Sequence, residues 1–132
     1  HILNRKIEYC NNNGLSIKCM VCGELKGVSD YDIHIILENL LDNAIEAALK
    51  AVNKRISVDI YSDEQAMVIK ISNTTEENVL KNNPEMNTTK KDNSYHGYGI
   101  RNVSELVKKN NGTIEYIQLG VDIVQCRVLL ML

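Results

Sequence analysis

A long amphipathic segment over residues 31–52 limits most strongly how this chain can fold. Its apolar residues recur at helical spacing and form one stripe: Ile33, Leu37, Leu40, Leu41, Ala44 and Ala48. The opposite stripe carries Asn39, Asn43, Glu46 and Lys50. Asparagine is a poor helix former because its side chain competes for backbone hydrogen bonds. Two asparagines one turn apart therefore indicate either a solvated surface or a face on which a polar ligand docks.

The remaining periodicities predict a compact arrangement of strands and helices. Helices are expected at 2–11, 31–52 and 99–110, and strands at 15–22, 55–62, 67–72, 113–119 and 123–132. The strands at 55–62 and 67–72 are expected to form a hairpin. This order favours a two-layer α/β (α+β) sandwich, with a mixed sheet and the helices on one face. We expect a single domain over residues 1–132, with a long polar lid at about 74–98.

Composition excludes several classes of protein. A net charge of −2 argues against a general nucleic-acid binder, and no apolar run is long enough to span a bilayer. We therefore expect neither nucleic-acid binding nor direct membrane contact by this segment. Of the four cysteines only Cys19 and Cys22 are close in sequence, which disfavours a structural zinc site and favours free thiols in a reducing cytoplasm.

Two further motifs support a ligand-binding interpretation. In HGYGI, residues 96–100, two glycines directly precede the predicted helix, where bare backbone N–H groups and the helix N-terminus suit a phosphate. A hinge that also caps the helix is the alternative. Asn73 ends a predicted strand where the lid begins, and its amide offers the donor and acceptor pair that an adenine edge requires. An asparagine that starts a turn is the alternative there.

ENLLDNAIEA followed by HGYGIRNV resembles the N box and the second glycine box of the GHKL ATP-binding superfamily. Within it, the chain is most similar to the ATP-binding domain of sensor histidine kinases of the accessory-gene-regulator, peptide quorum-sensing type. The resemblance runs from ILNRKIEYC, which looks like the junction after the dimerisation helices, through NNGTIEY to the last strand. It implies a Bergerat-type fold closed by an ATP lid.

The resemblance also implies ATP and Mg²⁺ as cofactors, with Asn43 as the protein ligand of the metal. The residues expected to bind ATP are Asn39, Asn43, Glu46, Asn73, Lys90, His96, Gly97, Tyr98, Gly99 and Ile100. The chain departs from the family pattern in several places. The first glycine box is missing, Asn73 replaces the adenine-binding Asp, and Tyr95 replaces a glycine. Glu46 stands where many kinases place a lysine that touches phosphate.

By this resemblance the domain donates the γ-phosphate of ATP to a histidine on a separate dimerisation domain. None of His1, His34 and His96 lies in a pattern like the acceptor motif, so the acceptor is expected outside this chain. We expect a cytoplasmic fragment of a bacterial membrane receptor, a downstream response regulator, and little turnover by the isolated domain. A non-catalytic nucleotide- or partner-binding module and a serine kinase of the anti-sigma-factor type stay open as alternatives.

Overall fold

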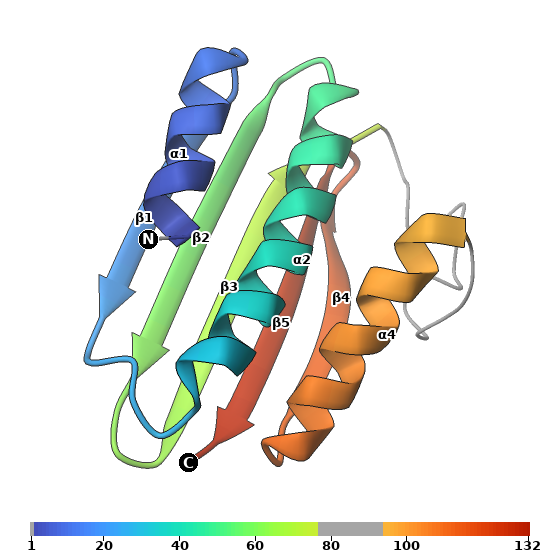
Figure 1. The fold of residues 1–132 in the computed structure, drawn as a ribbon. Coiled ribbons are helices and arrows are strands. Elements are labelled where there is room, and N and C mark those ends of the chain that lie inside the picture. The colour runs from blue at the N-terminus through green and yellow to red at the C-terminus, as the bar shows by residue number, and fades with distance from the viewer. Residues whose placement is uncertain (1, 77–93) are drawn as a thin grey trace.

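The computed structural model describes residues 2–76 and 94–132, which form a five-stranded mixed sheet with helices on one face (Figure 1). The elements run in the order α1 (Ile2–Asn12), β1 (Ser16–Cys22), α2 (Asp30–Leu49), β2 (Arg55–Ser62), β3 (Ala66–Thr74), α4 (Ser94–Lys109), β4 (Thr113–Gly120) and β5 (Ile123–Met131). This arrangement confirms the predicted two-layer sandwich.

The sheet has the strand order β1-β2-β3-β5-β4. β1 lies parallel to β2, whereas every other neighbouring pair is antiparallel, so the sheet is mixed as predicted. β2 and β3 form the predicted hairpin. Asp63 fixes its turn, because the carboxylate accepts hydrogen bonds from the backbone N–H groups of Gln65 (2.8 Å) and Ala66 (3.0 Å). β5 lies between β3 and β4, which places the C-terminal strand near the centre of the sheet.

The long helix α2 begins at a side-chain cap. Ser29 has an extended backbone, and its hydroxyl accepts a hydrogen bond from the N–H of Asp32 at 3.1 Å, as expected for an N-cap. The helix ends at Leu49, three residues before the predicted end, because the N–H of Lys50 turns back to Ala47 in a tighter turn. All six members of the predicted apolar stripe are buried.

The core lies between α2 and the central strands. Alternate side chains of β2, β3 and β5 point to the helix-covered face, as the period of two requires. They form the centre of the core with less than 2% of their surface exposed: Val58, Ile60, Met67, Ile69, Ile71, Val128 and Leu130. Each such aliphatic side chain contributes about 1.5–3 kcal/mol through burial. This packing fixes which side of α2 faces the sheet.

The predicted boundary between the lid and the second helix was wrong. α4 begins at Ser94, five residues before the predicted start at residue 99. The glycines at 97 and 99 therefore lie within its first turns and do not precede them. Glycine in a helix costs only about 1 kcal/mol relative to alanine, which the extended run of backbone hydrogen bonds can offset. Lys90 and most of the predicted lid lie in 77–93, outside the described residues.

The turn after α4 depends on a close approach between backbones. Asn111 takes the left-handed conformation (φ 55°), and the N–H of Gly112 bonds to the carbonyl of Val107 at 2.8 Å. A Cβ atom on Gly112 would lie 2.2 Å from the carbonyl oxygen of Leu129 on β5. Glycine is therefore required at 112 for space, because any larger residue would push α4 away from the sheet.

We expect Gly112→Ala to lower the free energy of unfolding by about 2–3 kcal/mol, the usual cost of forcing extra volume into a packed site. Gly120→Ala is the matched control, because a Cβ there meets nothing within 4 Å, and it should change stability by less than ~0.5 kcal/mol. Urea denaturation of both variants measures the difference. Equal midpoints would contradict the assignment of Gly112 as a packing glycine.

Candidate functional site

The two asparagines of α2 lie on the side of the helix that meets α4. Asp32, on the first turn of α2, accepts hydrogen bonds from Lys109 (3.1 Å) and Asn110 (3.2 Å) at the end of α4. Asn39 and Asn43 follow Asp32 by seven and eleven residues, close to two and three full turns. All three therefore share one stripe. The stripe faces α4, so Asn39 and Asn43 are not simply a solvated surface, and both are only half exposed.

The hydrogen bonding of Asn39 defines which of its atoms is available to a ligand. Its amide nitrogen donates to the carbonyl of Ile35, one turn earlier, at 2.9 Å. This leaves the amide oxygen as the atom that can meet a cation or a donor. Asn43 also takes part in a polar interaction. Two amide oxygens one turn apart can accept from metal-bound water or contact a hard cation, but as neutral groups they add no charge to the site.

Asn73 lies at the end of β3 on the helix-covered face of the sheet. It pairs in register with Ile56 on β2 and Val124 on β5. Its amide nitrogen donates to the carbonyl of Thr74 at 3.0 Å, so Oδ1 is left to act as an acceptor. In Figure 1, the end of β3, the C-terminal half of α2 and the beginning of α4 lie toward the same end of the sandwich. The fold therefore gathers the predicted motifs at one end.

The two threonines after Asn73 serve the fold. The hydroxyl of Thr74 accepts from the N–H of Arg55 at 3.0 Å and is 3.3 Å from the Arg55 carbonyl, which ties the end of β3 to the start of β2. The N–H of Thr75 donates to the carbonyl of Asp122 at 2.8 Å. Both threonines are buried. They hold the end of β3 in place and so fix the position from which the Asn73 side chain projects.

His96, Gly97, Tyr98, Gly99 and Ile100 lie in the first turns of α4, where the structure describes the backbone alone. Their predicted contacts to a ligand stay predictions. The same holds for Lys90, which lies outside the described residues. The fold does place this glycine-containing segment on the helix that the Asn39–Asn43 stripe faces.

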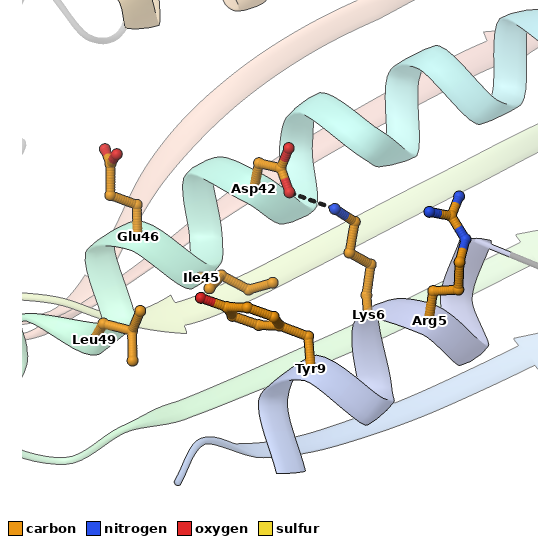
Figure 2. Close-up of a pocket in the computed structure, with 7 residues that line it drawn as sticks. All are labelled: Arg5, Lys6, Tyr9, Asp42, Ile45, Glu46 and Leu49. Carbon is orange, nitrogen blue, oxygen red and sulfur yellow. Dashed lines mark hydrogen bonds and ion pairs between the residues drawn. The ribbon is translucent and has the colours of Figure 1, made fainter. Parts of the chain in front are cut away.

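A second polar surface lies on the α1 side of α2, and Glu46 borders it. A groove of about 520 Å³ runs between α1 and α2, lined by Arg5, Lys6, Tyr9, Asp42, Ile45, Glu46 and Leu49. Figure 2 shows Asp42 turned toward Lys6, while the carboxylate of Glu46 points away from α1. Glu46 thus lies on the surface between the α1 side and the α4 side of α2. This groove could not be predicted from the sequence, because no sequence pattern indicates that α1 packs on α2.

Lys6 holds α1 on α2 by charge. Its ammonium group donates to Glu38 at 2.9 Å and to Asp42 at 2.5 Å, and its side chain is only 13% exposed. Burial disfavours the charged form of Lys6, but the hydrogen bonds that it donates to Asp42 and Glu38, together with their negative charges, outweigh this effect, so the pKa of Lys6 is raised. The hydrogen bond from Lys6 lowers the pKa of Glu38. The side chain of Glu38 is thereby held on the α1 side of α2.

Comparison with known proteins places the chain in a family. Residues 28–129 match the family model described as the GHKL domain, so the chain belongs to the GHKL domain family. A search of the curated proteins found no match. None of the helices that the structure describes is long and apolar enough to cross a membrane.

Solved structures of histidine kinases share the fold at low sequence identity. The catalytic domain of the histidine kinase ThkA superposes with a TM-score of 0.73 at 15% identity, covering 98% of this chain and 94% of that one. The mycobacterial sensor histidine kinase MprB superposes with a TM-score of 0.71 at 14% identity, covering 98% of this chain and 93% of that one. The Acinetobacter baumannii histidine kinase AdeS superposes with a TM-score of 0.67 at 14% identity, covering 98% of this chain and 62% of that one. The fold is therefore that of histidine kinase catalytic domains.

The contact between Asp32 and α4 should appear in the pH dependence of stability. Hydrogen bonds from Asn110 and Lys109 lower the pKa of Asp32 below its ordinary value of 3.8. A depressed pKa in the folded state contributes stability that is fully present above the unfolded value and lost as the pH falls through the folded value. We expect Asp32→Asn to be less stable than the wild type at pH 7.

The difference between the two proteins should shrink as the pH falls below 3.8, because the unfolded wild type binds a proton at Asp32 near that pH, whereas the folded protein binds it only at its lower pKa. Urea midpoints measured from pH 7 to pH 2.5 test this expectation. A difference that stays constant over the whole range would show that the carboxylate charge does not act at this contact.

Proposed function

We propose that this domain binds Mg-ATP between α2, the end of β3 and α4, as the catalytic domain of a two-component sensor histidine kinase. The observation that carries the proposal is the stripe of Asn39 and Asn43, which shares the α4-facing side of α2 with Asp32. Membership of the GHKL family and the histidine kinase fold support it.

The donor set fits a magnesium ion that arrives with its nucleotide. The described residues include no cluster of three or more His, Cys, Asp or Glu side chains that could hold a metal by themselves. Mg²⁺ prefers oxygen ligands and commonly binds through few protein groups plus substrate phosphates. A neutral amide oxygen on Asn43 suits an ion whose charge the triphosphate already balances. When bound, the ion would neutralise charge on the phosphates during transfer.

Glu46 is the predicted contact that suits phosphate least. A carboxylate next to phosphate is repelled unless a cation lies between the two groups. Its place beside the α1–α2 groove is consistent with a position at the margin of the site. Asn39 lies on the α4-facing stripe, where its oxygen would hold phosphate or metal-bound water.

Asn73 would recognise the adenine ring. Adenine presents an amino group that donates a hydrogen bond, and Asn73 Oδ1 is the matching acceptor because its amide nitrogen is occupied by the Thr74 carbonyl. An asparagine can therefore take over this role from the aspartate of the wider family.

The contacts of Glu38 favour phosphate transfer over ATP hydrolysis. Hydrolysis needs a carboxylate that activates water from the position of Asn39, and an amide cannot act as that base. The neighbouring Glu38 lies about 100° around the helix and is bound to Lys6 at 2.9 Å. Its lowered pKa makes it a weak base as well.

The full receptor that we propose is of the accessory-gene-regulator type. In it, this domain would lie in the cytoplasm of a bacterium, attached to a membrane receptor, and donate the γ-phosphate to a histidine on a separate helical dimerisation domain. A response regulator would take the phosphate onward. Because the acceptor lies elsewhere, the isolated domain should turn over little ATP. The net charge of −2 gives no reason to add nucleic acid as a partner.

Two other functions use the same fold differently. A non-catalytic module would bind nucleotide or a protein partner without transferring phosphate, and the missing first glycine box favours it. A serine kinase of the anti-sigma-factor type would use a similar pair of asparagines but transfer phosphate to a serine. Supplying the domain with dimerisation helices, or with a serine-bearing partner, separates these functions by the residue that becomes phosphorylated.

We expect Asn43→Ala to weaken Mg-ATP binding at least tenfold, a loss of about 1.4 kcal/mol, because the protein ligand of the metal is removed. Asn4→Ala is the matched control, since Asn4 is an exposed asparagine within helix α1. Isothermal titration with and without Mg²⁺ measures both. If the wild type shows no affinity in the millimolar range, the proposed function is wrong.

Asn73→Leu should weaken ATP binding about two- to tenfold, because a buried hydrogen bond to the base contributes roughly 0.5–1.5 kcal/mol. The affinity for inosine triphosphate, whose base lacks the amino group of adenine, should differ little between Asn73→Leu and the wild type. Asn73→Asp is the control that keeps an acceptor while losing the bond to Thr74, and we expect it to retain ATP binding within about threefold. Equal losses for both nucleotides in Asn73→Leu would argue against recognition of the amino group.

A further inference from the structure

Asp32 is the one charged residue in the buried class among residues 2–76 and 102–132, the part of the chain whose side-chain burial is described. Its side chain is 4% exposed. A buried carboxylate is costly unless it is paired and hydrogen-bonded. The Ser29 hydroxyl at the start of α2 is one partner, and the other two come from the end of α4. Lys109 Nζ lies 3.1 Å away and Asn110 Nδ2 3.2 Å away. The contact therefore joins the beginning of α2 to the end of α4.

The end of α4 is itself held firmly. Asn110 donates from its side chain to the carbonyl of Leu106 at 2.8 Å, and its backbone N–H bonds to Leu106 and Val107. Gly112 then packs against the Leu129 carbonyl of β5. Both sides of the Asp32 contact are thus fixed to rigid parts of the fold, and the contact can set the relative position of the two helices.

The two helices run antiparallel from this contact (Figure 1). Asn43 lies eleven residues after Asp32, and Gly99 lies eleven residues before Asn110. At 1.5 Å per residue, both positions are about 16 Å along their helices from the contact. The contact at one end of the pair therefore sets Gly99 level with Asn43 at the other. A shift of one residue in this register would move the glycine segment by about 1.5 Å.

We propose that Asp32 is a positioning residue for the nucleotide site, because its contact with Lys109 and Asn110 sets the register that places the glycine segment of α4 opposite Asn43. This inference rests on the proposed function. Asp32 itself touches no ligand. It determines the spacing between the amide stripe of α2 and the backbone of α4. Binding of the triphosphate depends on this spacing, whereas binding of the base does not.

Asp32→Asn removes the charge and keeps the shape of the side chain. It should raise the dissociation constant for Mg-ATP about five- to tenfold and leave the much weaker binding of adenosine within twofold. Hydrogen exchange of the α4 amides should become faster, while exchange in β3 stays unchanged. Asp63→Asn is the matched control, because that carboxylate also accepts two hydrogen bonds but lies at the β2–β3 turn. It should lower stability without changing either dissociation constant.

Lys109→Gln is a second variant that tests the same contact with less risk to folding, since the Lys109 side chain is 65% exposed. It should weaken Mg-ATP binding two- to threefold, and Lys109→Arg should restore it. All binding is measured at a temperature where circular dichroism shows each variant folded. Wild-type affinity in Lys109→Gln, and in Asp32→Asn wherever that variant folds, would overturn the inference and leave the proposed function standing. No binding by the wild type would overturn both.

Discussion

Burial of one face of α2 against the central strands is the interaction on which the rest of the structure depends. Ile36, Leu37 and Leu41 are almost fully buried there, opposite the aliphatic side chains of β3 and β5. Burial of this kind is non-directional, but once it has fixed the rotation of the helix, every other side chain of α2 has a defined direction. The helix then carries a charged surface toward α1 and an amide surface toward α4.

These two surfaces have different chemistry for a physical reason. On the α1 side, Lys6 is placed between Glu38 and Asp42, so opposite charges satisfy one another and the surface holds the helices together. On the α4 side, the asparagines are neutral and present oxygens, which suits a ligand that brings its own charge. The carboxylate on that side, Asp32, is paired with Lys109 and hydrogen-bonded by Asn110 at the far end of the helix pair. We propose the amide positions, and not Asp32, as the ligand-binding part of this surface.

Much of this could be predicted from the sequence, because period and capping are local properties. The alternation in RISVDIYS and the stripe from Ile33 to Ala48 indicated a strand and a helix whose bounds were close to those observed. The start of α4 was not predictable, since two glycines near a helix terminus read as a break while the structure continues the helix through them. Asp32 was also missed, because its partners lie 77 and 78 residues away in the chain.

The sequence by itself determined the elements, the buried faces and the asparagine stripe, because these follow from the spacing of residues along one helix or strand. Only the tertiary structure decided which neighbour each side of α2 meets. Helical spacing shows that Asn39 and Glu38 point in different directions, but it does not show which direction leads to α4. That depends on contacts between distant segments, such as Lys6 with Glu38 and Asp32 with Asn110, which form only when the sheet brings the helices together.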